Sequence, residues 1–382
     1  MREQLPPAVR AAMAALRPQD GPQLLFDRGE LARGMREAMA AARRAEVRVL
    51  FATKSFPHPE VLELAARHLD GFDVASLGEL TSVRDRLSSR HVVSVTDPTG
   101  EAPRGLPAAQ GGAAVIVSCE DAAQVAQALP LAPHARFALR VSSSLLGKDR
   151  AIGAVQSGDG HHRSRFGVDV EPARARVTLG EMSALAASHG RPVGLHLHHS
   201  GVVPTSAARF VESAQAALAL AREGGVTPTF FNLGGAWQGV ADQLPEVWLA
   251  LRAALPDLEL LVEPGRLFAR GAGFAVGWVR AARKLDDREL RVLDLSRACH
   301  LRWSQLELVA RAPRPGHGRK VCFVGPTCYE DDLLGEWQVD AQERYEPGAA
   351  VMLRHVTGYA VAWNSGFAGV PPATVRFVGD ER

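Results

Sequence analysis

The stretch VRVLFATKSFPH, at residues 47–58, decides how the rest of the chain is interpreted. Its first half is a nearly continuous apolar run, which is typical of a strand buried on both faces of a parallel sheet. Lys54 follows the run directly. A strand that leaves a core often ends in a solvated lysine, but a lysine in an apolar pocket loses basicity and can form a Schiff base with a carbonyl. The rest of the sequence has to distinguish a solvated lysine from a reactive one.

Seven further runs of this kind follow, and helical segments separate most of them. They are FDVAS from 72, HVVSV from 91, AAVIVS from 113, RFALRV from 136, VGLHLH from 193, TFFNL from 229 and LELLVE from 258. Strands of this kind in alternation with helices predict an α/β protein whose residues 29–270 form a (β/α)8 TIM-like barrel. A doubly wound open sheet is the alternative.

The character of the sequence changes after Arg270. Segments such as AAVMLRHVTGYAVAW lack a helical period and indicate antiparallel strands and turns, so residues 271–382 are predicted to form a β-domain. The N-terminal segment, residues 1–28, contains PQLLFD and is expected to add a strand to that domain. The interval 142–164 is rich in Gly and Ser and is predicted to be a long active-site loop.

Composition narrows the classes of function. The 44 basic and 42 acidic residues nearly balance, and without long blocks of like charge nothing favours nucleic acid or an anionic membrane as a partner. The four cysteines are spread without a CxxC pair, which favours a reducing compartment. The N-terminus lacks the apolar core of a signal peptide, and no apolar run approaches the ~20 residues that span a bilayer. We therefore expect a cytoplasmic protein.

Polar residues gather near the predicted strand ends, where the chemistry of such barrels takes place. Lys54 follows the first strand, Asp73 lies in the second and Arg140 in the fifth. His196 and His198 lie in the sixth. The sequence therefore predicts a site at the C-terminal face of the barrel.

The last two predicted strands end in NLGGAW (232–237) and VEPGR (262–266). Glycines let backbone N–H groups approach a phosphate, and Arg266 adds positive charge, although the glycines could also serve only as turns. Between these groups lies Glu263, a carboxylate able to keep a pyridine nitrogen protonated. With Lys54 to form an imine, these are the groups that pyridoxal phosphate requires, and we predict this cofactor.

Six segments in the right order resemble those of the fold-type III pyridoxal-phosphate-dependent decarboxylases, the group of ornithine, arginine and diaminopimelate decarboxylases. The resemblance runs from about residue 24 to residue 371 and implies a barrel plus β-domain of alanine-racemase-like architecture. The segments are FATKSFPHPEVLELAARHLDGFDVASLGEL, GLHLHHSG, FNLGGAW, VEPGR, VGPTCYEDD and TGYAVAWNSGFAG.

The resemblance implies decarboxylation of an amino acid through an aldimine of Lys54. His198 would stack on the cofactor ring and Glu263 would bind its nitrogen. Cys328, supplied by the partner subunit, would protonate the α-carbon, which implies a homodimer with composite sites. The expected cofactor-binding residues are Lys54, Asp73, Arg140, His198, Ser200, Gly234, Gly235, Glu263, Gly265, Arg266 and Tyr359.

The sequence departs from the family pattern where a substrate would bind. Tyr329 stands where relatives that act on basic substrates have an acid that binds the distal amine. Glu330, Asp331 and Asp332 are the candidates to replace it. We therefore expect a substrate other than simple ornithine, lysine or arginine, such as an amino-acid conjugate. A further departure is Asn232, which stands where the family has Asp.

Several alternatives stay open. His196, His198 and His199 could bind zinc, although no later strand end completes such a site and no metal is predicted. Cys328 could be a structural thiol, and Tyr359 a core residue. A racemase or epimerase dependent on pyridoxal phosphate would avoid an acid at the pyridine nitrogen. A non-catalytic pyridoxal-phosphate-binding protein would be a barrel alone.

Overall fold

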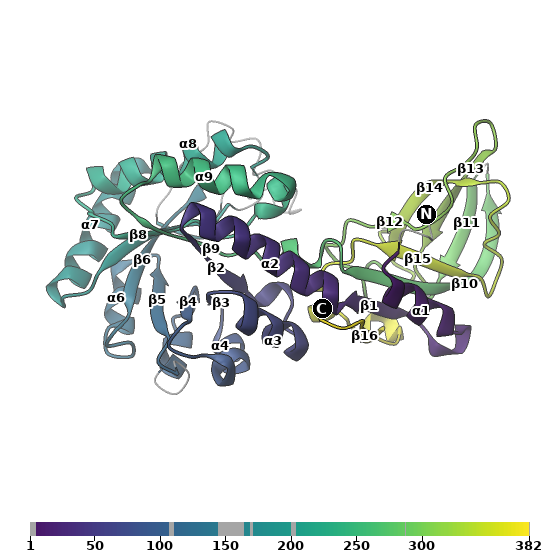
Figure 1. The fold of residues 1–382 in the computed structure, drawn as a ribbon, viewed down its shortest axis with the longest axis horizontal. Helices are drawn as coiled ribbons and strands as arrows, with labels where there is room; N and C mark the ends of the chain where they lie inside the picture. Colours follow the sequence, from purple (N-terminus) through teal and green to yellow (C-terminus); the bar gives the residue numbers. More distant parts are fainter. Residues whose placement is uncertain are drawn as a thin grey trace. The chain divides into compact units, whose positions relative to one another are not determined.

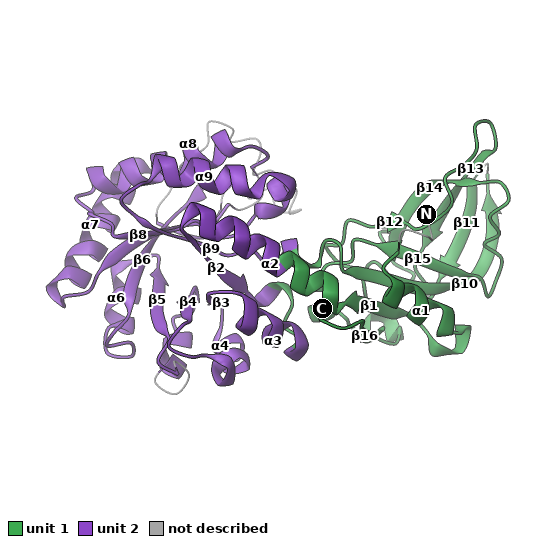
Figure 2. Ribbon diagram, viewed as in Figure 1, with its two compact units in different colours: residues 1–34, 55–58, 268–382 green, residues 35–54, 59–267 purple. Residues whose placement is uncertain are grey.

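The structure is a computed structural model that describes residues 5–106, 111–143, 164–168, 171–199, 204–286 and 288–381. The chain divides into two compact units (Figure 2). The barrel unit consists of residues 35–54 and 59–267, and the β-unit of residues 1–34, 55–58 and 268–382. Most of the loop predicted at 142–164 lies outside the described residues.

Eight parallel strands close into a barrel in the order of the sequence (Figure 1). They are β2 (Val47–Ala52), β3 (Gly71–Val74), β4 (Val92–Val95), β5 (Ala114–Cys119), β6 (Arg136–Val141), β7 (Val193–Leu197), β8 (Phe230–Asn232) and β9 (Glu259–Val262). The first and last strands, β2 and β9, pair with each other and close the ring. The predicted (β/α)8 barrel is confirmed.

Helices follow most of these strands and flank the barrel (Figure 1). They are α3 (Pro59–His68), α4 (Leu77–Val83), α6 (Ala122–Ala128), α7 (Pro172–Ser188), α8 (Ala207–Glu223) and α9 (Leu244–Ala254), while α2 (Arg28–Ala45) precedes β2. Side chains of Ser76, Asp121 and Ser206 accept hydrogen bonds from backbone N–H groups of the first turns of α4, α6 and α8. Among the described residues, no helix is long and apolar enough to cross a membrane.

Side chains from every second position of the strands fill the barrel in layers, because a strand has a two-residue period. At the N-terminal end, Arg48 and Arg136 form ion pairs with Glu259. Two residues further along, an apolar layer follows. Its buried members are Leu50, Val92, Ile116, Ala138, Phe230 and Leu261.

A polar layer lies above the apolar one, again two residues further along. Its members are Ser94, Ser118, Arg140, His196, Asn232 and Glu263, and all of them are buried. A hydrogen bond joins Asn232 of β8 to Ser94 of β4, two strands that are not neighbours in the ring. The bond therefore crosses the barrel interior, which places the polar layer inside.

Gly194 and Phe230 are complementary in the apolar layer, because the ring occupies the space that a larger residue at 194 would need. A Cβ atom at Gly194 would lie 2.5 Å from the Phe230 ring. We expect Gly194→Ala to lower the free energy of unfolding by about 1–3 kcal/mol, measured by urea denaturation. The double variant Gly194→Ala/Phe230→Leu should recover part of this loss.

The matched control is Gly78→Ala in helix α4, where the nearest atom to the added methyl group would be 3.8 Å away. This variant should lose no stability, because alanine favours a helix over glycine. An equal loss for Gly194→Ala with and without Phe230→Leu would contradict the proposed fit.

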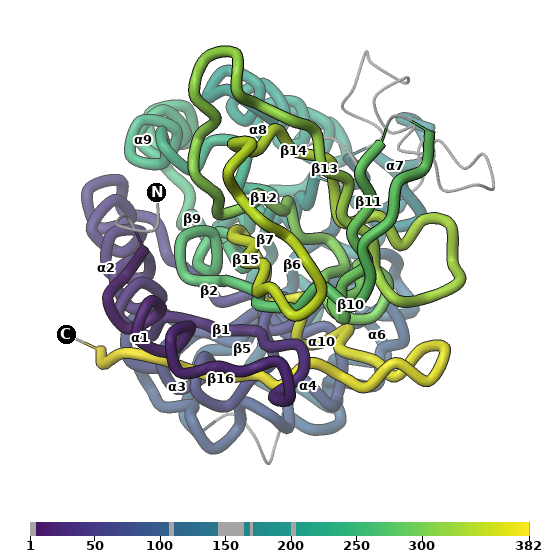
Figure 3. Tube along the Cα trace, turned by 90° about the vertical axis from the view of Figure 1, so that its right-hand side faces the viewer, coloured from purple at the N-terminus to yellow at the C-terminus, as the bar shows by residue number. Residues whose placement is uncertain are grey.

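The β-unit is built on a mostly antiparallel eight-stranded sheet. Its strands are β1 (Gln23–Asp27), β10 (Gly273–Leu285), β11 (Arg288–Leu293), β12 (Glu307–Leu308), β13 (Gly318–Val324), β14 (Leu333–Asp340), β15 (Ala350–Arg354) and β16 (Thr374–Val378). The N-terminal strand β1 is antiparallel to β10 and parallel to β16, so strands from both ends of the sequence lie side by side (Figure 3).

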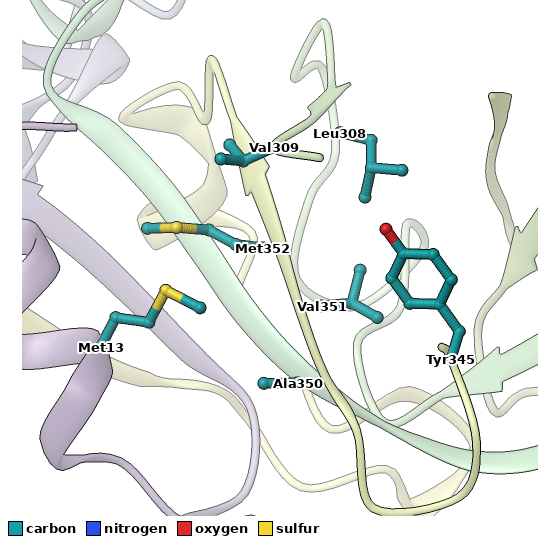
Figure 4. A pocket seen from close by; sticks show the side chains of 7 residues that line it. All are labelled: Met13, Leu308, Val309, Tyr345, Ala350, Val351 and Met352. Carbon is teal, nitrogen blue, oxygen red and sulfur yellow. The ribbon is translucent and has the colours of Figure 1, made fainter. Parts of the chain in front are cut away.

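Helix α1 (Pro7–Ala15) packs against this sheet. Val9 is buried in an apolar cluster with Phe274, Trp278 and Met352. A small pocket beside Met13 is lined by residues of the sheet and its loops (Figure 4). Its volume of about 10 Å³ leaves room for no more than one water molecule, so we regard it as a packing gap.

The four residues directly after Lys54 belong to the β-unit, although the barrel unit surrounds them in sequence. Phe56 is 2% exposed, and its ring lies 4.6 Å from the Phe26 ring and 5.9 Å from the Phe377 ring. A Cβ atom at Gly358 would lie 2.3 Å from Phe56, so glycine is needed there. The chain thus leaves the barrel unit after Lys54, buries one aromatic side chain in the β-unit and returns at Pro59. The sequence did not predict this excursion.

Candidate active site

The structure distributes the predicted site residues over both units. Those of the barrel unit lie at or just beyond the C-terminal ends of its strands: Lys54, Asp73, Arg140, His198, Gly234, Gly235, Glu263, Gly265 and Arg266. The predicted residues Cys328, Tyr329, Glu330, Asp332 and Tyr359 belong to the β-unit. Ser200 lies outside the described residues.

Lys54 follows strand β2 and forms an ion pair with a buried carboxylate. The Lys54 Nζ lies 2.7 Å from the Asp73 Oδ2, and the carboxylate of Asp73 is fully buried while 36% of the lysine side chain is exposed. The second oxygen of Asp73 is buried and has no hydrogen-bond partner among the residues that the structure describes. A carboxylate at this distance fixes the position of the lysine side chain. Lys54 is therefore an oriented, partly accessible amine.

Glu263 is buried in the polar layer and is held by neutral donors. Its Oε1 accepts hydrogen bonds from the Asn232 Nδ2, at 2.5 Å, and from the Ser94 Oγ, at 3.1 Å. Burial, together with the negative charge of Asp73, raises the pKa of Glu263 to about 8, although Lys54, Asn232 and Ser94 act in the opposite direction. At neutral pH this carboxyl group holds a proton that it can share with a basic nitrogen.

Two histidines of the site are neutral. Burial, and next the positive charges of Lys54 and Arg140, lower the pKa of His198 to about 3. Burial also holds the pKa of His196 well below its usual range, and its Nδ1 lies 2.7 Å from the Ser118 Oγ. As a correction to the sequence analysis, β7 ends at Leu197, so His198 lies just beyond the strand.

The zinc alternative gains no support from these histidines. Within the described ranges, no three His, Cys, Asp or Glu side chains form a group that could hold a metal ion. The Nε2 of His196 instead lies 3.7 Å from the Glu263 Oε2, inside the barrel.

The glycine turn after β8 is shaped so that side chains cannot fill it. Gly234 and Ala236 have positive φ values of 61° and 75°. A Cβ atom at Gly234 would lie 2.7 Å from the Leu197 carbonyl oxygen, and one at Gly235 would lie 3.0 Å from the His198 Nε2. Such a turn lets backbone N–H groups approach a ligand closely, which fits a phosphate.

Arg140 acts on the site mainly through its charge. Its Nη1 lies 2.8 Å from the Glu120 Oε1, and its guanidinium group lies 4.5 Å from the centre of the Phe166 ring. These contacts fix the side chain inside the barrel, where its charge contributes to the low pKa values of His196 and His198.

Cys328 is exposed on the loop between β13 and β14 in the β-unit, and Asp332 closes that loop. The Asp332 carboxylate is 3% exposed and accepts hydrogen bonds from the Thr327 Oγ1 at 2.7 Å, the Ser296 Oγ at 2.9 Å and the Arg297 N–H at 2.7 Å. These hydrogen bonds hold the Asp332 carboxylate within its own unit, and its substrate-binding role stays a prediction.

Five aromatic side chains of the same unit form two sets of ring contacts. The Tyr359 ring lies 4.9 Å from the Trp303 ring, which lies 5.6 Å from that of Trp363. The Tyr329 ring lies 6.4 Å from that of Phe367. Exposed fractions of 46% for Trp303, 53% for Tyr329, 40% for Trp363 and 54% for Phe367 are large for such side chains. We call these five residues the aromatic surface.

Residues 28–270 match the family model of the pyridoxal binding domain of pyridoxal-dependent decarboxylases, which covers more than half of the chain. The chain belongs to this family. It is a carboxy-lyase whose cofactor is pyridoxal phosphate, as the sequence predicted. The family match thus favours a decarboxylase over the racemase and the non-catalytic alternatives.

Relatives and solved structures agree with the family match. The chain is 27% identical over 370 residues to diaminopimelate decarboxylase from Deinococcus radiodurans, covering 94% of this chain and 91% of the relative. It is 24% identical to ornithine decarboxylase from Schizosaccharomyces pombe, covering 88% and 79%. A crystal structure of diaminopimelate decarboxylase from Helicobacter pylori complexed with L-lysine has a TM-score of 0.76 at 20% identity, covering 97% of this chain and 94% of that one. At this identity the structural likeness supports the fold.

Sequence reasoning did not identify Ser94 and Ser118 as members of the site. A signal was available, because each lies two residues beyond an apolar strand residue, Val92 and Ile116, that faces the barrel interior. A polar residue at this offset in a strand buried on both faces indicates a polar layer near the C-terminal end.

The raised pKa of Glu263 predicts how stability depends on pH. Between its ordinary value of 4.5 and about 8, the folded protein holds a proton that the unfolded chain has lost. The free energy of unfolding therefore falls as pH rises through this window. Glu263→Gln lacks this dependence, so between about pH 5 and about pH 9 its stability should improve relative to the wild type. Urea denaturation of both cofactor-free proteins measures the difference, and a difference that does not change with pH would contradict the assignment.

Proposed function

We propose that the protein decarboxylates an amino acid or amino-acid conjugate, with Lys54, Glu263 and His198 of the barrel unit and Cys328 of a partner subunit as the reacting and cofactor-binding groups. The observation that supports this most directly is the Lys54–Asp73 pair, at 2.7 Å, in the same site as a carboxyl group that keeps its proton at neutral pH. When bound, pyridoxal phosphate supplies an electron sink for the electrons released with carbon dioxide.

Each residue has a role that follows from its environment. Lys54 would hold the cofactor covalently, and Asp73 would keep the amine in position. Glu263 would share its proton with the pyridine nitrogen. His198 would lie flat against the ring, which its neutral state permits without adding a charge to the site.

The phosphate would bind at the glycine turn. Gly235 would offer its backbone N–H group there, while Gly234, whose N–H donates to the Asn232 side chain, would keep the turn in shape. Gly265 and Arg266 follow Glu263 closely in the sequence. Tyr359 and Ser200 remain phosphate-binding residues implied by the family resemblance alone.

A homodimer would supply Cys328 to the site of the other subunit. The thiol is exposed on a closed loop, so it is accessible to a second copy. The aromatic surface lies in the same unit, and exposed aromatic side chains are typical of an interface between subunits. Cys328 would then return a proton to the α-carbon.

The substrate would carry a distal group other than a simple amine. Tyr329 presents an exposed phenol in place of an acid, although the exposed Glu330 follows it. Diaminopimelate is a specific candidate, because the relatives include its decarboxylases and the Arg302 guanidinium lies 4.4 Å from the centre of the Trp363 ring in the aromatic surface. A guanidinium group there can bind a distal carboxylate.

Replacement of the proposed cofactor lysine tests this function first. The purified wild type should show the visible absorption band of lysine-bound cofactor, and Lys54→Ala should lose both the band and carbon dioxide release. Lys320→Ala, which removes an exposed lysine paired with Glu336, is the matched control and should keep both. A colourless wild type that added cofactor cannot change would overturn the proposal. Efficient release from ornithine, lysine or arginine would overturn the substrate assignment alone.

Mixing two inactive variants tests whether the site is composite. Lys54→Ala and Cys328→Ala should each release little carbon dioxide alone. If each site combines Lys54 of one subunit with Cys328 of the other, random exchange of subunits should restore about a quarter of the wild-type activity. Sedimentation measures the dimer in parallel. A mixture that stays inactive although its subunits exchange would place both residues in one subunit.

A further inference from the structure

Asn232 is a member of the polar layer, and both the oxygen and the nitrogen of its side-chain amide form hydrogen bonds. The side chain is fully buried at the end of β8. Its Oδ1 accepts a hydrogen bond of 3.0 Å from the Gly234 N–H. Since a backbone N–H can only donate, this contact fixes the orientation of the amide and turns the Nδ2 toward Glu263.

The amide therefore determines which oxygen of Glu263 is free. The Asn232 Nδ2 donates to the Glu263 Oε1 and, at 3.2 Å, to the Ser94 Oγ, and the Ser94 hydroxyl donates to the same Oε1. With two donors on Oε1, the proton of the carboxyl group has to reside on Oε2. A backbone hydrogen bond also joins the two segments, because the Glu263 N–H donates to the Gly234 carbonyl oxygen at 2.7 Å.

We propose that Asn232 is a positioning residue that joins the glycine turn to the Glu263 carboxyl group, so that one buried amide sets the two ends of the cofactor site. The inference rests on the proposed function, in which the turn binds the phosphate and Glu263 the ring nitrogen. An aspartate at this position could still accept from Gly234, but it would offer Glu263 no donor, and its carboxylate would compete for the Glu263 proton.

The contact of Asn232 with Glu263 is tested by cofactor affinity. The full-length protein is stripped of cofactor and then titrated with pyridoxal phosphate. Asn232→Asp should weaken binding by about tenfold or more, because the donor to the Glu263 Oε1 is lost and the aspartate competes with the ring nitrogen for the Glu263 proton. In a Glu263→Gln background, the glutamine amide can donate to the carboxylate that replaces the Asn232 amide, so the same change should weaken binding by less than about threefold. Equal factors in both backgrounds would overturn the inference.

Inorganic phosphate, competing with the cofactor, tests the half of the inference that concerns the turn. Asn232→Ala removes the acceptor for the Gly234 N–H and should weaken phosphate binding severalfold. Asn232→Asp/Glu263→Gln keeps an acceptor there and the same total of carboxyl and amide groups, so its phosphate affinity should stay near that of the wild type. Unchanged phosphate binding in Asn232→Ala would overturn this half. Asn232→Ser serves if the alanine variant does not fold.

Thr229→Val is the matched control on the same chain segment. Thr229 directly precedes β8, and its hydroxyl donates to the Val193 carbonyl oxygen, away from the polar layer. This variant should bind cofactor and phosphate as the wild type does, and circular dichroism should show that all variants are folded. A wild type that does not bind pyridoxal phosphate would overturn the proposed function and this inference with it, whereas a binding wild type matched by Asn232→Asp would overturn the inference alone.

Discussion

The two-residue period of strands closed into a ring is the constraint on which the structure depends. It sends every second side chain of eight strands into one shared interior, where the polar groups are buried. The apolar layer fills the middle, so the polar residues above it have to satisfy one another. Ser94, Asn232 and Glu263 come from three strands and form one hydrogen-bonded group for this reason. The site is thus a consequence of barrel closure rather than of any single loop.

Charge in this interior is compensated locally, and that arrangement sets the chemistry. Lys54 is paired with Asp73, and Arg140 with Glu120, while the two histidines nearby are neutral. Glu263 faces amide and hydroxyl donors instead of a cation and keeps its proton. The site therefore contains one oriented amine and one protonated acid, each held by its own neighbours. These are the two functional groups that a pyridine aldehyde cofactor uses.

The local pattern of apolar residues was sufficient to predict the barrel strands and the polar side chains at their ends. Lys54 and Glu263 each follow an apolar run, and a parallel barrel brings such ends together whatever the loops do. Interactions that join distant segments were not predictable in this way. The hydrogen bonds of Asp332, for example, come from Ser296 and Arg297, which lie on another segment. The contact of Asn232 with Ser94 requires the register of β4 and β8 across a closed ring, and a single sequence does not specify that register.

Because residues 55–58 belong to the β-unit, the barrel and the β-domain cannot be exchanged between related proteins independently of each other. The peptide bond after Lys54 is also a boundary between units, so the lysine belongs to the barrel while its next neighbours belong to the other fold. A β-domain exchanged between relatives would have to provide a packing site for Phe56. Here the rings of Phe26 and Phe377 form that site, and Gly358 leaves room for the Phe56 ring. A barrel isolated from its β-domain would keep the lysine in its sequence but lose the anchor of the segment that follows it. Recombination within the family is therefore restricted by the aromatic packing around Phe56.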